Sequence, residues 1–171
     1  MNSLMSTLAT IRTGLAVIFA SLLLSACASY NGSGLKPGES TLAEVESMMG
    51  TAAMRWQNAD GSQQLAFTRG PAGFHTFMAV VGADGRLQSI KNVLDTKNMT
   101  RIQAGMTQEQ VLRILGPTTC RTEYFAARDE LVWDWRYLDD FRESAHFFVL
   151  FDATKGTVRS TMSTAAGEVC L

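Results

Sequence analysis

The sequence has few of the residues on which enzyme active sites and metal centres most often depend. Its 171 residues include two histidines and three cysteines, with no Gly-x-Ser-x-Gly, no His-Glu-x-x-His and no paired cysteine-ligand spacing. Fifteen Lys and Arg against 16 Asp and Glu give a formal net charge of −1, so no basic excess points to nucleic acid. We therefore expect no enzyme, no cofactor, no metal site and no nucleic-acid partner.

The sequence also has no apolar run long enough to cross a membrane. A membrane-spanning helix needs about 17 or more such residues, whereas the small and apolar run here covers only Gly14–Leu24. Arg12 is the one charged residue before Cys27. A single charge followed by a short apolar run is typical of a signal peptide, which we place at residues 1–26.

The end of this leader predicts a lipid anchor. Leu24, Ser25 and Ala26 precede Cys27, and small residues before a cysteine suit lipoprotein signal peptidase. Cys27 would then carry diacylglycerol and an N-acyl chain such as palmitate, and more than one chain makes an anchor stable. Ala28 stands where an aspartate would signal inner-membrane retention, so we expect an outer-membrane lipoprotein facing the periplasm. Residues 27–36 would form the lipidated cysteine and a short tether.

The rest of the chain is organised around a short helix, Met106–Leu115, with clear start and stop signals. Thr107 and Gln110 have the spacing of a capping box, and the apolar residues that follow recur at helical spacing. Gly116 and Pro117 form a stop signal.

The same pattern occurs twice in the chain. Upstream, Thr41 and Glu44 repeat the capping box and Gly50 repeats the glycine stop. Downstream of each helix, a His-x-Phe motif precedes a turn glycine by ten residues: His75 before Gly85, and His146 before Gly156. We infer an α+β fold of two tandem units, residues 37–92 and 93–171. In each, one or two short helices would pack on a four-stranded antiparallel sheet.

Apolar and turn residues place the remaining elements. We expect a first helix at Leu42–Met49, a bridging helix at Leu94–Gln103, and strands at residues 53–58, 63–69, 74–81, 86–91, 118–124, 131–137, 146–151 and 157–164.

The strand at residues 131–137 alternates between aromatic and charged side chains. Trp133 and Trp135 should face the helices, while Asp134 and Arg136 should face water on the opposite side. A charged, open sheet face suits a protein partner better than a small molecule, which prefers an apolar pocket. We therefore predict that Asp134 and Arg136 bind a protein partner, with Phe141 in the following polar loop as an exposed anchor.

The motifs of the second unit resemble a known family. A lipobox, Gly105-Met106-Thr107, Gly116-Pro117 and a Trp-rich strand are similar to the SmpA/OmlA, or BamE-like, outer-membrane lipoproteins. This resemblance implies a non-enzymatic scaffold or accessory in outer-membrane assembly or envelope integrity, with envelope proteins such as the β-barrel assembly machinery as partners. Two tandem units are also similar to the β-lactamase inhibitor protein, which leaves a membrane-anchored inhibitor of a periplasmic enzyme as the alternative.

Two further cysteines remain in the mature chain. In an oxidising periplasm Cys120 and Cys170 can pair, which would close a loop of about 50 residues and contribute on the order of 4 kcal/mol. A thiol-dependent enzyme using Cys120, His146 and Asp134 is a competing interpretation, as is a metal site formed by His75, His146 and a cysteine. Because the two histidines occupy equivalent repeat positions, packing explains them better.

Overall fold

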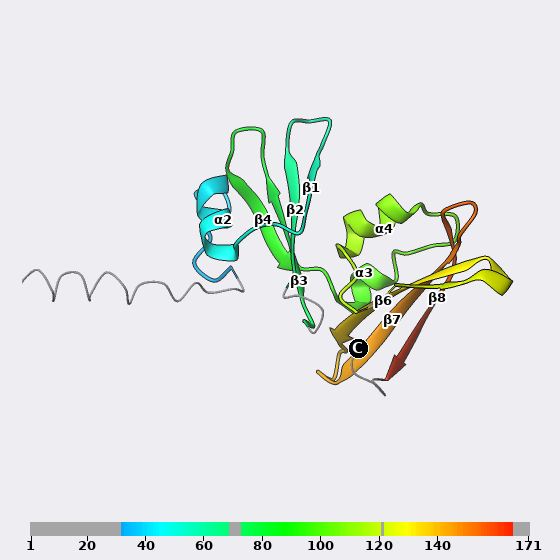
Figure 1. The fold of residues 1–171 in the computed structure, drawn as a ribbon. Coiled ribbons are helices and arrows are strands. Elements are labelled where there is room, and N and C mark those ends of the chain that lie inside the picture. The colour runs from blue at the N-terminus through cyan, green and yellow to red at the C-terminus, as the bar shows by residue number, and fades with distance from the viewer. Residues whose placement is uncertain (1–31, 69–72, 121, 166–171) are drawn as a thin grey trace, which may run out of the picture.

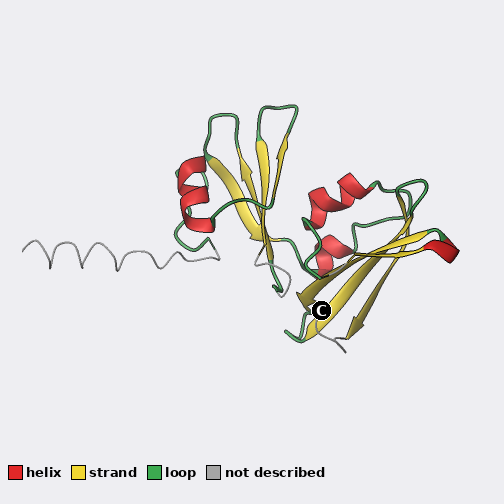
Figure 2. Cartoon of the chain, viewed as in Figure 1, coloured by secondary structure: helices red, strands yellow, loops and turns green. Residues whose placement is uncertain are grey.

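The computed structural model describes residues 32–68, 73–120 and 122–165, which form two units in tandem (Figure 1). Each unit has one four-stranded antiparallel sheet with its strands in sequence order. Short helices lie beside the sheets (Figure 2). The predicted α+β class and tandem arrangement are confirmed. None of the helices in the described ranges is long and apolar enough to cross a membrane.

The first unit consists of helix α2 and strands β1 to β4. Helix α2 spans Leu42–Met49, and the strands span Met54–Gln57, Gln63–Thr68, Thr76–Val81 and Leu87–Asn92. The helix packs against one face of the sheet through Val45 and Met49, which meet Leu65, Phe67 and Val81 in one buried cluster.

The second unit repeats this plan with longer strands. Helices α3 (Thr96–Met99) and α4 (Gln108–Leu115) precede β5 (Thr122–Phe125), the short 3-10 helix η2 (Ala126–Arg128), β6 (Glu130–Leu138), β7 (Ser144–Asp152) and β8 (Thr157–Ala165). The core between helices and sheet contains Val111, Leu115, Trp135, Val149 and Phe151, each fully buried. Trp133 packs against this core at its edge, which confirms the predicted inward face of β6.

The sequence signals for the two main helices are both present as hydrogen bonds. In α2 the Thr41 hydroxyl accepts from the Glu44 backbone N–H, and in α4 the Thr107 hydroxyl accepts from that of Gln110; both capping boxes are complete. Gly50 and Gly116 end the two helices with positive φ angles of 82° and 74°, which glycine adopts at little cost.

The backbone also confirms the repeat at the entrance to each helix. In the second unit Gly105 donates to the Val158 carbonyl, and Val158 donates to that of Met106. In the first unit Gly38 donates to the Leu87 carbonyl, and Leu87 donates to that of Ser40. Gly38 precedes Thr41 by three residues, whereas Gly105 precedes Thr107 by two. This additional residue explains why the Gly-Met-Thr spacing is not visible in the first unit.

Two predicted elements differ from the structure. The bridging helix expected at Leu94–Gln103 is reduced to the single turn α3, which begins with Asp95 as its N-cap and ends at Met99. The first strand of the second unit was expected from residue 118, but β5 begins at Thr122. Cys120 therefore precedes this strand, with its backbone N–H donating to the Asp134 carbonyl.

The two units contact each other through the C-terminal end of α4. Arg113 donates to the Asn58 side-chain oxygen at 3.0 Å, and its own carbonyl accepts from Gln64 at 2.6 Å. The Arg113 guanidinium also lies 5.7 Å from the Trp56 ring centre. Helix α4 therefore covers part of the face of the first sheet that α2 leaves free.

Candidate functional site: the open face of the second sheet

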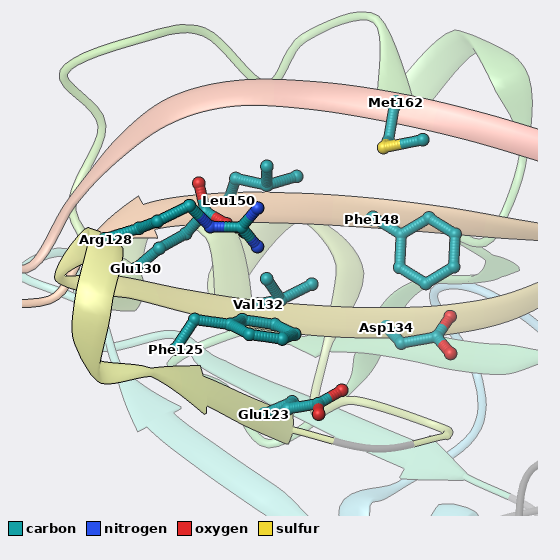
Figure 3. A pocket seen from close by; sticks show the side chains of 9 residues that line it. All are labelled: Glu123, Phe125, Arg128, Glu130, Val132, Asp134, Phe148, Leu150 and Met162. Atoms are coloured by element: carbon teal, nitrogen blue, oxygen red, sulfur yellow. Dashed lines mark ion pairs between the residues drawn. The ribbon is translucent and has the colours of Figure 1, made fainter.

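The sheet face opposite α3 and α4 contains a hollow of about 380 Å³ on β6, β7 and β8 (Figure 3). Its centre is apolar, with side chains from four strands or their connections: Phe125, Val132, Phe148, Leu150 and Met162. The charged residues around it are Glu123, Arg128, Glu130 and Asp134. Cross-strand register explains this grouping, because Asp134 pairs with Phe148, which pairs with Met162.

The expectation that this face is mainly charged and hydrated was therefore wrong. Strand β7 has apolar residues on both faces, so Phe148 and Leu150 point outward while Phe147 and Val149 enter the core. Met162 is 50% exposed and contributes its side chain to the hollow. The apolar residues along β7 are the feature of the sequence from which this surface could have been predicted.

Asp134 is buried beside His146 rather than solvated. The His146 Nδ1 atom lies 2.9 Å from Oδ1 and 3.1 Å from Oδ2 of Asp134, and the two residues are 7% and 4% exposed respectively. Buried charges are normally paired in this way, because an unpaired one is costly. The prediction that Asp134 contacts a partner assumed a hydrated side chain, but this side chain is buried.

Arg136 does not extend freely into solvent either. Its guanidinium lies 4.2 Å from the ring centre of Phe74 in the first unit, and its Nε donates to Ser144 Oγ at 3.3 Å. Its backbone N–H donates to Thr119 Oγ1 at 2.9 Å. Arg136 is therefore a second contact between the units, next to the edge of the open face.

Cys120, Asp134 and His146 do come together, as the thiol-enzyme interpretation required. Their potential ligand atoms lie within 4.8 Å of one another. If Cys120 forms the predicted disulfide, its sulfur provides no thiolate for catalysis or metal binding. The other two cysteines lie outside the described residues, so the pairing of Cys120 with Cys170 stays a prediction.

The two histidines occupy equivalent positions and make equivalent contacts. His75 stacks on Phe77 with ring centres 6.0 Å apart, and His146 stacks on Phe148 at 5.8 Å. His75 is not part of the group formed by Cys120, Asp134 and His146. The shared stacking supports packing as the common role of this repeat position.

Phe141 is the most exposed large apolar side chain of the described part of the chain, at 86%. It lies in the turn after β6, where its backbone N–H donates to the Asp139 carboxylate at 2.9 Å. Its exposure fits the predicted anchor, while the partner contact itself stays a prediction.

The β7–β8 turn is fixed by charge. The Lys155 backbone N–H donates to Asp152 and, together with nearby Arg159, lowers the pKa of the Asp152 carboxyl. The Arg159 guanidinium donates to the same carboxylate at 3.1 Å. This network holds the first residues of β8 against β7.

The Gly-Pro stop after α4 is hydrogen-bonded to the Trp-rich strand β6. The indole Nε1 of Trp135 donates to the carbonyls of Gly116 and Pro117, at 3.2 and 3.0 Å. The end of α4 is thereby fixed to the centre of the sheet.

Residues 91–161 match the family model of the outer membrane protein assembly factor BamE domain. The second unit is therefore the part of the chain that is similar to the BamE domain. The match begins at the end of β4 and reaches into β8, so it includes both helices and most of the second sheet. The first unit lies outside the matched residues. No curated protein matches the chain.

Proposed function

We propose that this protein is a lipid-anchored, non-enzymatic accessory of outer-membrane assembly that binds other envelope proteins. The match of residues 91–161 to the BamE domain carries this proposal. The sequence before Cys27 supports the anchor, because its short apolar run and small residues fit a lipoprotein leader. Cys27 itself lies outside the described residues.

We further propose that the open face of the BamE domain is the partner-binding surface. Its centre combines five apolar side chains with charged residues at the rim, which is how protein interfaces are commonly built. Arg136 lies near the C-terminal end of β6 and Phe141 lies in the turn that follows, while Asp134 fixes the middle of the strand by pairing with His146. In this arrangement Phe148 and Leu150 are the binding residues, while Asp134 and Arg136 position the surface.

Crosslinking of the mature lipoprotein in membranes, followed by affinity purification, tests this function. We expect subunits of the β-barrel assembly machinery or other outer-membrane assembly proteins to be recovered. Leu150→Glu places a charge in the centre of the open face and should remove them. Tyr124→Glu is the matched control, because Tyr124 is 57% exposed and is not part of the hollow.

Two results would contradict the proposal. Equal recovery of partners with Leu150→Glu and Tyr124→Glu would place the binding surface elsewhere. Recovery of one soluble hydrolase, with its activity inhibited by the purified protein, would instead support the alternative of an anchored inhibitor.

A further inference from the structure

Strand β8 presents a long edge with a single charged residue to solvent. It is the last strand of the second sheet and pairs with β7 alone over Thr157–Ala165. Residues 159–165 are all exposed, and only Arg159 among them is charged. Within the described residues, nothing pairs with the outer side of this strand beyond Val158.

Among the described residues, this edge lacks the protection that sheet edges usually have. Native proteins protect edge strands with charges, proline, covering elements or very short strands. The opposite edge strand, β5, covers only Thr122–Phe125 and ends in a 3-10 helix. By contrast, residues 160–165 of β8 read Ser-Thr-Met-Ser-Thr-Ala, without charge or proline.

The chain itself shows that the start of this edge can accept another strand. Val158 donates to the Met106 carbonyl and accepts from the Gly105 backbone N–H, both at 2.8 Å. Thr107 forms an isolated antiparallel bridge with Thr157. The pairing stops there, because the chain turns away into α4.

A different surface lies on each side of the unpaired edge. On the helix side, a hollow of about 410 Å³ lies between α3 and β8, lined by hydroxyl residues such as Thr161 and Ser163 and by apolar Met99 and Ile102. On the opposite side lies the mainly apolar hollow that includes Met162. Because side chains alternate along a strand, a strand added to β8 would place successive residues in these two environments.

We propose that the outer edge of β8 binds an extended segment whose residues alternate between apolar and small polar side chains. Apolar residues of the segment lie beside Met162 on the open face, and small polar residues lie beside Thr161 and Ser163 under α3. Main-chain hydrogen bonds supply affinity in such strand addition, and the alternate pockets supply specificity. If the proposed role in outer-membrane assembly is correct, the segment is a strand of an unfolded outer-membrane protein, because transmembrane β-strands have this alternation.

Hydrogen–deuterium exchange of the mature protein tests the proposal with two synthetic peptides of identical composition. The first alternates leucine and threonine between terminal lysines, and the second has the same residues with the leucines in adjacent pairs. We expect the alternating peptide to protect amides of residues 159–165, and the paired-leucine peptide to protect none. Ser163→Lys should weaken binding of the alternating peptide at least about tenfold, since lysine is a common edge-protecting residue. Thr122→Lys, the same change on exposed β5, should leave it unchanged.

Equal protection by both peptides, protection away from β8, or equal binding by the two lysine variants would overturn the proposal. So would two results in the peptide-free protein. Protection of residues 159–165 that increases with protein concentration would identify a second copy as the occupant. Protection that is lost when residues 166–171 are removed would identify the tail. Failure of peptide binding together with a normal yield of envelope partners would contradict strand addition alone and leave the proposed function intact.

Discussion

Gly116 ends α4 directly against Thr76 of the first sheet. A methyl group at Gly116 would lie 2.6 Å from the Thr76 Cγ2 atom, and Gly116 has a φ angle of 74°. The glycine therefore serves two purposes: it allows the helix to end, and it allows the two units to approach closely. The family's Gly-Pro signal thus also positions the first unit, although the match to the BamE domain does not include that unit.

This double role predicts that Gly116→Ala costs more stability than an equivalent change elsewhere. Gly105 has a similar φ of 89°, but a methyl group there would meet nothing within 4 Å. Gly105→Ala should therefore cost about 1 kcal/mol from backbone strain. Gly116→Ala should cost about 2–4 kcal/mol, because overpacking adds to the strain. Urea unfolding of the two variants measures the difference, and equal costs would contradict the close contact.

The buried pair of Asp134 and His146 gives a second prediction. Asp134→Lys should destabilise the protein by about 3–5 kcal/mol, because it breaks a buried pair and buries an unpaired charge. Glu123→Lys, on the exposed part of the same face, should change stability by less than about 1 kcal/mol. If both variants unfold at the same urea concentration, Asp134 is not buried in solution.

The predicted disulfide between Cys120 and Cys170 gives a third prediction. If Cys120 pairs with Cys170, Cys170→Ala should lower the melting temperature of the oxidised protein and make Cys120 reactive toward maleimide. Removing a native disulfide commonly costs about 2–5 kcal/mol. Thiol titration of the unfolded, unreduced mature protein, with the Cys27 sulfur acylated, should find no free thiol. Two free thiols and an unchanged melting curve would show that the pair is absent.

The anchor gives a fourth prediction. Cys27→Ser removes the thiol that would receive diacylglycerol, so the mutant should keep its leader or be lost from the outer-membrane fraction. Membrane fractionation with a mass measurement of the N-terminus checks this. Mature Cys27→Ser protein that still fractionates with the outer membrane would show that the anchor lies elsewhere.

Local signals in the sequence predicted most of the fold. The capping boxes at Thr41 and Thr107 depend on residues three positions apart, so the chain displays them directly. The alternation of β6 likewise identified Trp135 as a core residue. The bridging helix was predicted too long because Ile102, an apolar residue in the helical pattern, is instead buried in the core after the helix has ended.

The candidate site was harder to predict because it depends on neighbours that are distant in sequence. Alternation placed Asp134 on the correct face but could not show that His146, on the neighbouring strand β7, would bury it. Nor could it show that Phe74 of the first unit would lie beside Arg136. The apolar character of β7 was visible, but Phe148 was interpreted only through its repeat position.

The most direct test of the central claim is the amount of folded β-barrel protein in the outer membrane of a strain that lacks this chain. Folded barrels can be measured by their heat-modifiable migration on gels. The account predicts that this amount falls in the deletion strain, recovers with the wild-type chain or Tyr124→Glu, and does not recover with Leu150→Glu. An unchanged amount of folded barrel protein in the deletion strain would contradict a role in outer-membrane assembly.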